Sequence, residues 1–149
     1  MNQRISDYIN KHREDIINDW RDLVNLEGSL REPDNLLIEA RWLKQKFTDA
    51  GVSCHIVTTK ENYPPVLIGT IGENRLGKPV IFGGHFDTVF DKGTFGDHPF
   101  RIDEEGNAHG PGVLDMKGGI IITLWTIKAL EFIGYQDRPI RICFCSDEE

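Results

Sequence analysis

The chain has no long apolar run, no excess of basic residues and no disulfide-rich pattern, and each absence excludes a class of protein. No stretch of its 149 residues approaches 18 consecutive apolar positions, so the sequence predicts no membrane-spanning helix. The formal charge is −7, from 24 acidic and 17 basic residues. Nucleic-acid grooves and anionic membrane surfaces both attract clustered basic side chains, so we expect neither nucleic acid nor membrane among the partners.

Three cysteines are also too few, and odd in number, for a disulfide framework. Cys143 and Cys145 lie in an apolar run typical of a strand, and we expect them, like Cys54, to be buried thiols in a reducing compartment. Core packing is the expected role of Cys143 and Cys145. The first residues, MNQRISD, lack the apolar run of a signal peptide. These features predict a cytoplasmic protein.

What the sequence does contain is enough apolar material for a folded core. Eight Phe and three Trp exclude intrinsic disorder. Apolar residues at helical spacing, and one almost wholly apolar run that should be buried, predict three helices. The predicted helices cover residues 5–26, 32–50 and 116–132, and Gly51 is expected to stop the second.

Short β-like runs alternate with these helices in the second half of the chain. The predicted strands cover residues 54–58, 66–71, 79–82 and 140–145, with a small hairpin joining 100–103 to 107–109. The compact run 79–82 is expected to be a buried central strand. This order predicts an α/β protein: a three-layer α/β/α sandwich with a mainly parallel mixed sheet.

Three polar clusters stand where such folds place ligand sites. His85 and Asp87 follow one predicted strand, Asp115 precedes the buried helix, and Glu148 and Glu149 follow another strand. Because sites gather at the carboxyl ends of strands and at helix N-termini, adjacent strands would bring all three clusters to one rim. Taken singly, each has an ordinary explanation: a loop histidine, a helix N-cap or a solvated acidic tail.

Together, the clusters supply the chemistry of a metal-assisted hydrolase. Neutral imidazole and carboxylates suit zinc, and a carboxylate between two cations can bridge them. Asp87 is two residues after His85, on the same side of an extended segment, where it could accept the second ring N–H of the imidazole. Glu148 and Glu149 point in different directions, so one can bind metal while the other stays free as a general base.

The sequences GHFDTV (84–89), GPGVLDMKGG (110–119) and DEE (147–149) resemble three successive signatures of one family. It is the co-catalytic di-zinc metallopeptidase family that includes glutamate carboxypeptidase, aminoacylase, acetylornithine deacetylase and succinyl-diaminopimelate desuccinylase. The spacing also matches, with 30 residues from His85 to Asp115 and 34 from Asp115 to Glu149. The Gly-Pro-Gly before Asp115 is most similar to the glutamate carboxypeptidase branch. The resemblance implies hydrolysis of an amide or peptide bond by a metal-bridging water, with a peptide or an N-acyl amino acid as substrate.

The resemblance also implies a role for each motif residue. His85 would bind one metal, Glu149 the other, and Asp115 would bridge the two. The catalytic residues would be Glu148, as the general base, and Asp87, which would orient His85. The implied cofactors are two Zn²⁺ ions, for which Co²⁺ or Mn²⁺ could substitute.

Other residues of the motifs have smaller expected roles. The resemblance implies a cis peptide between Asp115 and Met116. Gly83-Gly84 and Gly118-Gly119 should permit close backbone approach near the metal rim and at the helix start, with ordinary turn or packing glycines as the alternative. Lys117 could interact with the acidic rim, but a solvated lysine at a helix start is the favoured expectation. His98 and His109 match no ligand position and are expected to have surface or hairpin roles.

Members of this family carry a further carboxylate ligand, a final ligand histidine and an inserted dimerisation domain, none of which is found within residues 1–149. We therefore expect residues 1–149 to be the N-terminal segment of a metallopeptidase catalytic domain, with each metal held by two protein ligands where a catalytic zinc normally has three plus water. Such a chain should bind metal weakly and hydrolyse little. Uncovered apolar surface would favour a homo-oligomer.

Two other interpretations remain open at this stage. One is a non-catalytic truncated product that acts as a binding or interaction module. The other, a nucleotide-binding α/β domain, has less support, because the Gly-Pro-Gly lacks the third glycine of a dinucleotide fingerprint and no phosphate-loop motif occurs.

Overall fold

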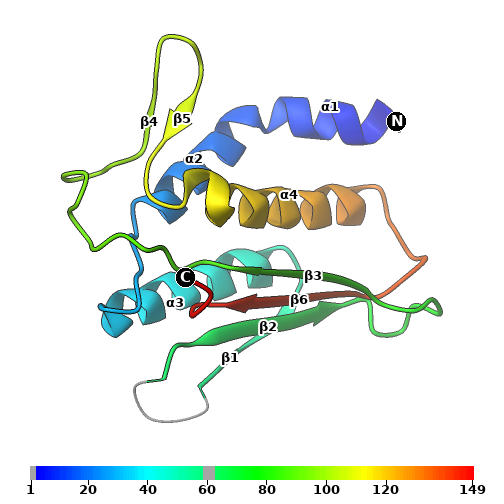
Figure 1. Ribbon diagram of the computed structural model, residues 1–149. Helices are drawn as coiled ribbons and strands as arrows, with labels where there is room; N and C mark the ends of the chain where they lie inside the picture. The colour runs from blue at the N-terminus through cyan, green and yellow to red at the C-terminus, as the bar shows by residue number, and fades with distance from the viewer. Residues whose placement is uncertain (1–2, 59–62) are drawn as a thin grey trace.

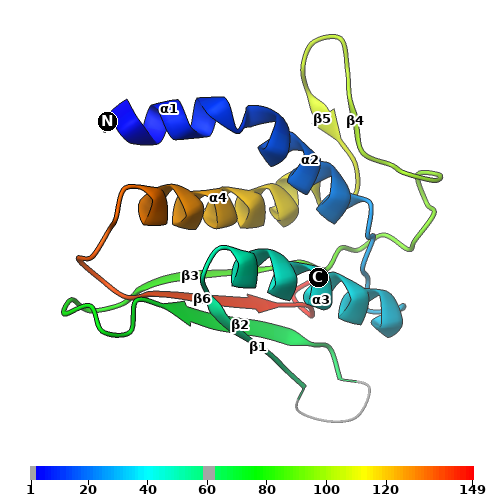
Figure 2. The ribbon, with the colours of Figure 1, turned by 180° about the vertical axis from the view of Figure 1, so that it is seen from behind.

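A computed structural model describes residues 3–58 and 63–149, which form a four-stranded sheet with helices packed on one face (Figures 1 and 2). The helices are α1 (Gln3–Lys11), α2 (Arg13–Val24), α3 (Pro33–Asp49) and α4 (Gly118–Phe132), and a π-helical turn, η1 (Val113–Lys117), precedes α4. The strands are β1 (Ser53–Val57), β2 (Val66–Ile71), β3 (Val80–His85), β4 (Arg101–Ile102), β5 (Ala108–His109) and β6 (Ile140–Cys145).

The strand order of the main sheet is β1-β2-β6-β3. The predicted α/β class with a mixed sheet is confirmed. The expectation of a mainly parallel sheet was wrong, since β1–β2 and β2–β6 are antiparallel and only β6–β3 is parallel. Within the described residues, helices cover one face, so two of the three expected layers are present.

Strand β3 is not the buried central strand that its apolar run suggested. It pairs with β6 alone among the described strands, and the side chain of Ile81 is 63% exposed. An apolar run shows that a strand could be buried on both faces. The position of that strand in the sheet depends on which other segments pair with it, and the run itself carries no information on that point.

The core lies between the sheet and helices α3 and α4. Phe47 of α3 packs against Phe144 of β6 with a ring separation of 5.6 Å, and both side chains are fully buried. Helices α1 and α2 pack on the outer side of α4 (Figure 1). Among the described residues, no helix combines the length and the apolar character needed to cross a membrane.

The predicted helix over 32–50 is confirmed, and Gly51 ends it in a left-handed conformation with φ of 88°. The single helix predicted over 5–26 is instead two helices. His12 interrupts it with φ −102° and ψ 19°, and the imidazole packs on Tyr8 and Trp125. Residues 10–15 contain no apolar side chain, so no apolar contact within this stretch holds it in one continuous helix.

The three cysteines are free, but they are not equally buried. Cys54 is buried and Cys145 is partly buried, whereas Cys143 is exposed. Because side chains alternate along β6, Cys143 points away from the helices, to the sheet face that no described helix covers. Core packing was therefore the wrong expectation for Cys143.

The predicted small hairpin is confirmed as β4–β5, and it leads directly into the loop that carries Asp115. The Nε2 atom of His109 lies 2.7 Å from an Asp103 carboxylate oxygen. This hydrogen bond, with that from the backbone of Asn107, lowers the pKa of Asp103 to about 2. His109 thus has the hairpin role expected of it, and His98 is exposed, as expected.

Candidate metal centre

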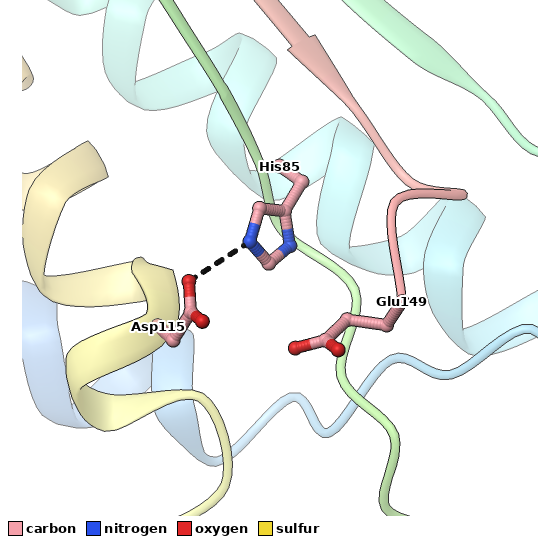
Figure 3. Close-up of side chains that lie close together, drawn as sticks. All are labelled: His85, Asp115 and Glu149. Atoms are coloured by element: carbon pink, nitrogen blue, oxygen red, sulfur yellow. Dashed lines mark hydrogen bonds and ion pairs between the residues drawn. The ribbon is translucent and has the colours of Figure 1, made fainter.

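His85, Asp115 and Glu149 come from three separate elements and meet at one edge of the sheet (Figure 3). His85 is the last residue of β3 and is paired with Cys145 at the end of β6, four residues before Glu149. Because β3 and β6 are parallel, their carboxyl ends meet at the same edge. The turn η1 brings Asp115 to this edge, and one ligand atom from each of the three residues lies within 4.8 Å of the others.

His85 links the two carboxylates expected to act on it. Its side chain is 6% exposed, and Nε2 lies 3.1 Å from Oδ1 of Asp115. On the other side of the ring, Nδ1 lies 3.4 Å from Oδ1 of Asp87, which is fully buried. The other Asp87 oxygen accepts the backbone N–H of Glu149 at 3.0 Å. Asp87 therefore contacts two of the three residues in the cluster.

These charges determine the protonation behaviour of the imidazole. Burial alone lowers the pKa of His85. The hydrogen bond with Asp115 and the nearby charges of Asp87, Asp115 and Glu148 outweigh burial, so the pKa of His85 is raised above its ordinary value. The three carboxylates therefore favour positive charge at this imidazole.

Two atoms of the site are buried without a hydrogen-bond partner: Nδ1 of His85 and Oδ1 of Asp87. Such orphaned groups are rare and costly. These two atoms face each other, so a proton on Nδ1 would form a hydrogen bond with Asp87 and give both atoms a partner. The other ring nitrogen, Nε2, would then keep a free lone pair on the side of Asp115. Nε2 is then the atom available to a cation. This arrangement and the donor set of one imidazole and two carboxylates fit zinc.

Glu148 lies at the margin of the cluster. Its Oε2 is 4.0 Å from His85 Nε2, and its side chain is 60% exposed. Glu149 belongs to the cluster itself. The two adjacent acids thus take different positions, as their alternation on an extended segment led us to expect.

The local path of η1 explains how Asp115 reaches the sheet. Gly112 takes a left-handed conformation with φ of 65°, and its carbonyl accepts the N–H of Lys117 at 2.9 Å. The indole of Trp20 donates to the carbonyl of Val113 at 3.2 Å. The Asp115–Met116 peptide is cis, as the family resemblance implied.

Gly84 has the close-approach role expected of it. A Cβ atom at this position would lie 2.6 Å from the sulfur of Met116. Gly84 thus lets the residue after Asp115 pack directly on β3, because a side chain here would have to displace the Met116 thioether, whereas a Cβ atom at Gly83 would meet its nearest atom only at 3.8 Å.

Lys117 is the clearest correction to the sequence-based expectations. It is fully buried rather than solvated, and its Nζ lies 2.8 Å from Oε1 of Glu39, which is also fully buried. A signal for this pair was present in the sequence. Glu39 lies on the apolar stripe of α3, three residues after Leu36 and four before Leu43, where an acid without a partner would be very unfavourable.

Comparison with known proteins finds a match to the segment that contains His85, Asp115 and Glu149. Residues 81–149 match the model of Peptidase family M20/M25/M40. Carboxypeptidase G2 from Pseudomonas sp. (strain RS-16) is 30% identical over 139 residues, covering 90% of this chain and 32% of that protein.

Solved structures share the fold at low sequence identity. The di-peptidase Dug1p from Saccharomyces cerevisiae matches with a TM-score of 0.83 and 17% identity, covering 98% of this chain and 34% of that one. The M20 family metallo-carboxypeptidase Sso-CP2 from Sulfolobus solfataricus matches with a TM-score of 0.76 and 18% identity, covering 90% of this chain and 31% of that one. The chain thus spans about a third of the length of these relatives. Residues 81–149, just under half of this chain, are thus similar to peptidase family M20/M25/M40.

Proposed function

We propose that His85, Asp115 and Glu149 hold the metal of a hydrolase that cleaves amide or peptide bonds, of the carboxypeptidase or N-acyl-amino-acid amidohydrolase type. One observation carries the proposal: within a segment that is similar to a peptidase family, these three side chains meet at the carboxyl ends of two parallel strands. The substrate would be a peptide or an N-acyl amino acid.

The residues of the site would divide the work as follows. A bound zinc ion supplies a Lewis acid for the substrate carbonyl and lowers the pKa of water. Asp87 would hold the imidazole of His85 so that Nε2 is directed at the metal position. Glu148, exposed beside His85 Nε2, would accept the proton of the attacking water as general base.

We propose two Zn²⁺ ions that share Asp115, with Co²⁺ or Mn²⁺ as substitutes. One would use His85 and Asp115, and the other Asp115 and Glu149. Because a catalytic zinc normally has three protein ligands, this set supports only weak metal binding and slow hydrolysis by the 149 residues alone. The three free cysteines support a reducing compartment, such as the cytoplasm, as the location.

The different positions of Glu148 and Glu149 give a direct test. We expect Glu149→Gln to weaken Zn²⁺ binding at least about tenfold, because a ligand loses its charge. Glu148→Gln should leave Zn²⁺ binding nearly unchanged and lower zinc-dependent hydrolysis by about 10²-fold or more, since a general base is lost. Calorimetric zinc titration and hydrolysis of dipeptides and N-acyl amino acids measure the two effects.

Glu104→Gln is the matched control, because Glu104 is an exposed acid at the tip of the β4–β5 hairpin. It should change neither quantity. Equal zinc affinity in the wild type and Glu149→Gln would contradict the proposed ligand set. Rapid hydrolysis by the 149-residue chain would contradict the proposed shortage of ligands.

We also propose that the chain associates with a second copy of itself through the uncovered face of the sheet. Ile68, Ile81 and Cys143 are exposed on neighbouring strands of this face. Sedimentation velocity over a range of concentrations should show a dimer or larger species for the wild type. The Ile81→Lys variant should be a monomer at the same concentrations. A wild type that is a monomer at every concentration would overturn the proposal.

A further inference from the structure

A buried ion pair joins helix α3 to the turn η1, which carries Asp115 of the candidate metal centre. The side chains of Lys117 and Glu39 are both fully buried, with Nζ and Oε1 2.8 Å apart. A buried ion pair is weak evidence for stability, because removing two charges from water costs about as much as their attraction returns. Stability alone therefore does not explain why these two charges are buried here.

Lys117 connects the pair to the turn that carries Asp115. It is the last residue of η1, two residues after Asp115. Its backbone N–H closes the turn on Gly112, and its Nζ donates to the carbonyl of Leu23 near the end of α2 at 3.1 Å. The ammonium group thus fastens this turn to both α2 and α3.

Glu39 connects the pair to the loop that carries Asp87. Its second oxygen accepts the backbone N–H of Gly28 at 3.1 Å. The carbonyl of the same Gly28 accepts the N–H of Thr88 at 3.0 Å, and the Thr88 hydroxyl also lies within hydrogen-bond distance, at 3.4 Å. Thr88 directly follows Asp87, which contacts His85. Hydrogen bonds and one ion pair therefore run without interruption from Lys117 to the loop beside His85.

The residues of this path approach one another closely. A Cβ atom on Gly28 would lie 2.4 Å from Oε2 of Glu39, and one on Gly112 would lie 2.6 Å from a methyl carbon of Thr88. Glycine at these two positions lets the Asp115 turn, the α2–α3 connection and the Asp87 loop pack directly on one another.

We propose that Lys117 and Glu39 are positioning residues, which set the spacing between Asp115 and the His85–Asp87 pair and so hold the metal site ready for its ion. This inference rests on the proposed function. Metal ligands must be held to within about 0.5 Å by the residues around them. Loss of such support typically lowers metal affinity by 10–100-fold.

The decisive variant is K117M/E39Q, which removes both charges, nearly preserves the side-chain volumes and leaves an acceptor for the Gly28 N–H. Because both charges are lost together, we expect this variant to fold. Its Co²⁺ affinity should fall at least about tenfold, and the visible absorption spectrum of bound Co²⁺ should change. Without metal, the backbone N–H of Thr88 should exchange with solvent faster than in the wild type.

The matched control is R75M/E131Q, at the other end of α4. Arg75 Nη2 and Glu131 Oε1 are 2.7 Å apart, and the Arg75 side chain is 4% exposed. This variant should keep the Co²⁺ affinity, the Co²⁺ spectrum and the Thr88 exchange rate of the wild type, whatever its stability.

Unchanged Co²⁺ affinity and spectrum in folded K117M/E39Q would overturn the inference, as would an equal loss in R75M/E131Q. If K117M/E39Q does not fold, Glu39→Asp, which keeps both charges and shortens the side chain by one methylene, is measured in the same way, and a change below twofold overturns the inference. A wild type that takes up no Co²⁺ contradicts the proposed function. The exchange of Thr88 without metal then decides the positioning role alone, and an unchanged rate overturns it.

Discussion

Asp115→Asn is expected to lower the affinity for Zn²⁺ by more than about 100-fold. The carboxylate of Asp115 lies 3.1 Å from His85 Nε2, belongs to the three-residue cluster and is the ligand that two ions would share. Residues that only support ligands already account for 10–100-fold in affinity, so loss of the shared ligand charge should exceed that range. Calorimetric titration with zinc measures the change, and circular dichroism shows whether the variant is folded.

Asp147→Asn provides the matched control for this experiment. Asp147 is an exposed acid of the same DEE motif, but it is not part of the cluster. Its replacement lowers the net negative charge by the same amount, and the affinity should stay within about threefold, since exposed charges act weakly at a distance. If both variants bound zinc equally well, Asp115 would not be a ligand.

Lys117→Met alone is expected to lower the free energy of unfolding by about 3–5 kcal/mol, because it leaves the carboxylate of Glu39 buried without its counter-ion. Urea unfolding at neutral pH, followed by circular dichroism, measures this loss. Adding Glu39→Gln should recover much of it, since the uncompensated charge is then removed. A single variant as stable as the wild type would show that the pair carries no such energy.

The loss in Lys117→Met should also depend on pH. Burial raises the pKa of Glu39, while the charge and hydrogen bond of Lys117 oppose this rise. Without Lys117, the folded state should bind a proton at Glu39 more readily than the unfolded state. Stability of the variant relative to the wild type should therefore improve as the pH falls toward and below the ordinary pKa of a glutamate. A loss that does not change with pH would indicate that the destabilisation has another cause.

Local patterns in the sequence were sufficient for several elements. The helix α3 and its stop at Gly51 followed from apolar spacing and one glycine, and β6 followed from an apolar run over 140–145. The break at His12 was missed, because apolar residues on both sides of it still match one helical face. Whether a helix continues through a polar stretch depends on what packs against it, and a single-sequence periodicity does not include that contact.

Pairing and burial were predicted less well, for a related reason. The apolar character of β3 could not show that it lies at the edge of the described sheet, and that of β6 could not show that Cys143 is exposed. The first depends on which strands pair with β3, and the second depends on which face of the sheet the helices cover. Both properties belong to the assembled sheet and its layers rather than to a single strand.

The sequence by itself determined the chemistry of the candidate site: the residue types, their order, and the motifs around His85, Asp115 and Glu149 that resemble those of a peptidase family. These features are local, because a metal-binding motif needs particular side chains at particular positions. Only the tertiary structure showed that Lys117 is buried against Glu39 and that Gly28 joins this pair to the Asp87 loop. Lys117 and Glu39 are 78 positions apart in the chain, and a buried charge becomes favourable only when a distant partner is brought within a few ångströms by folding.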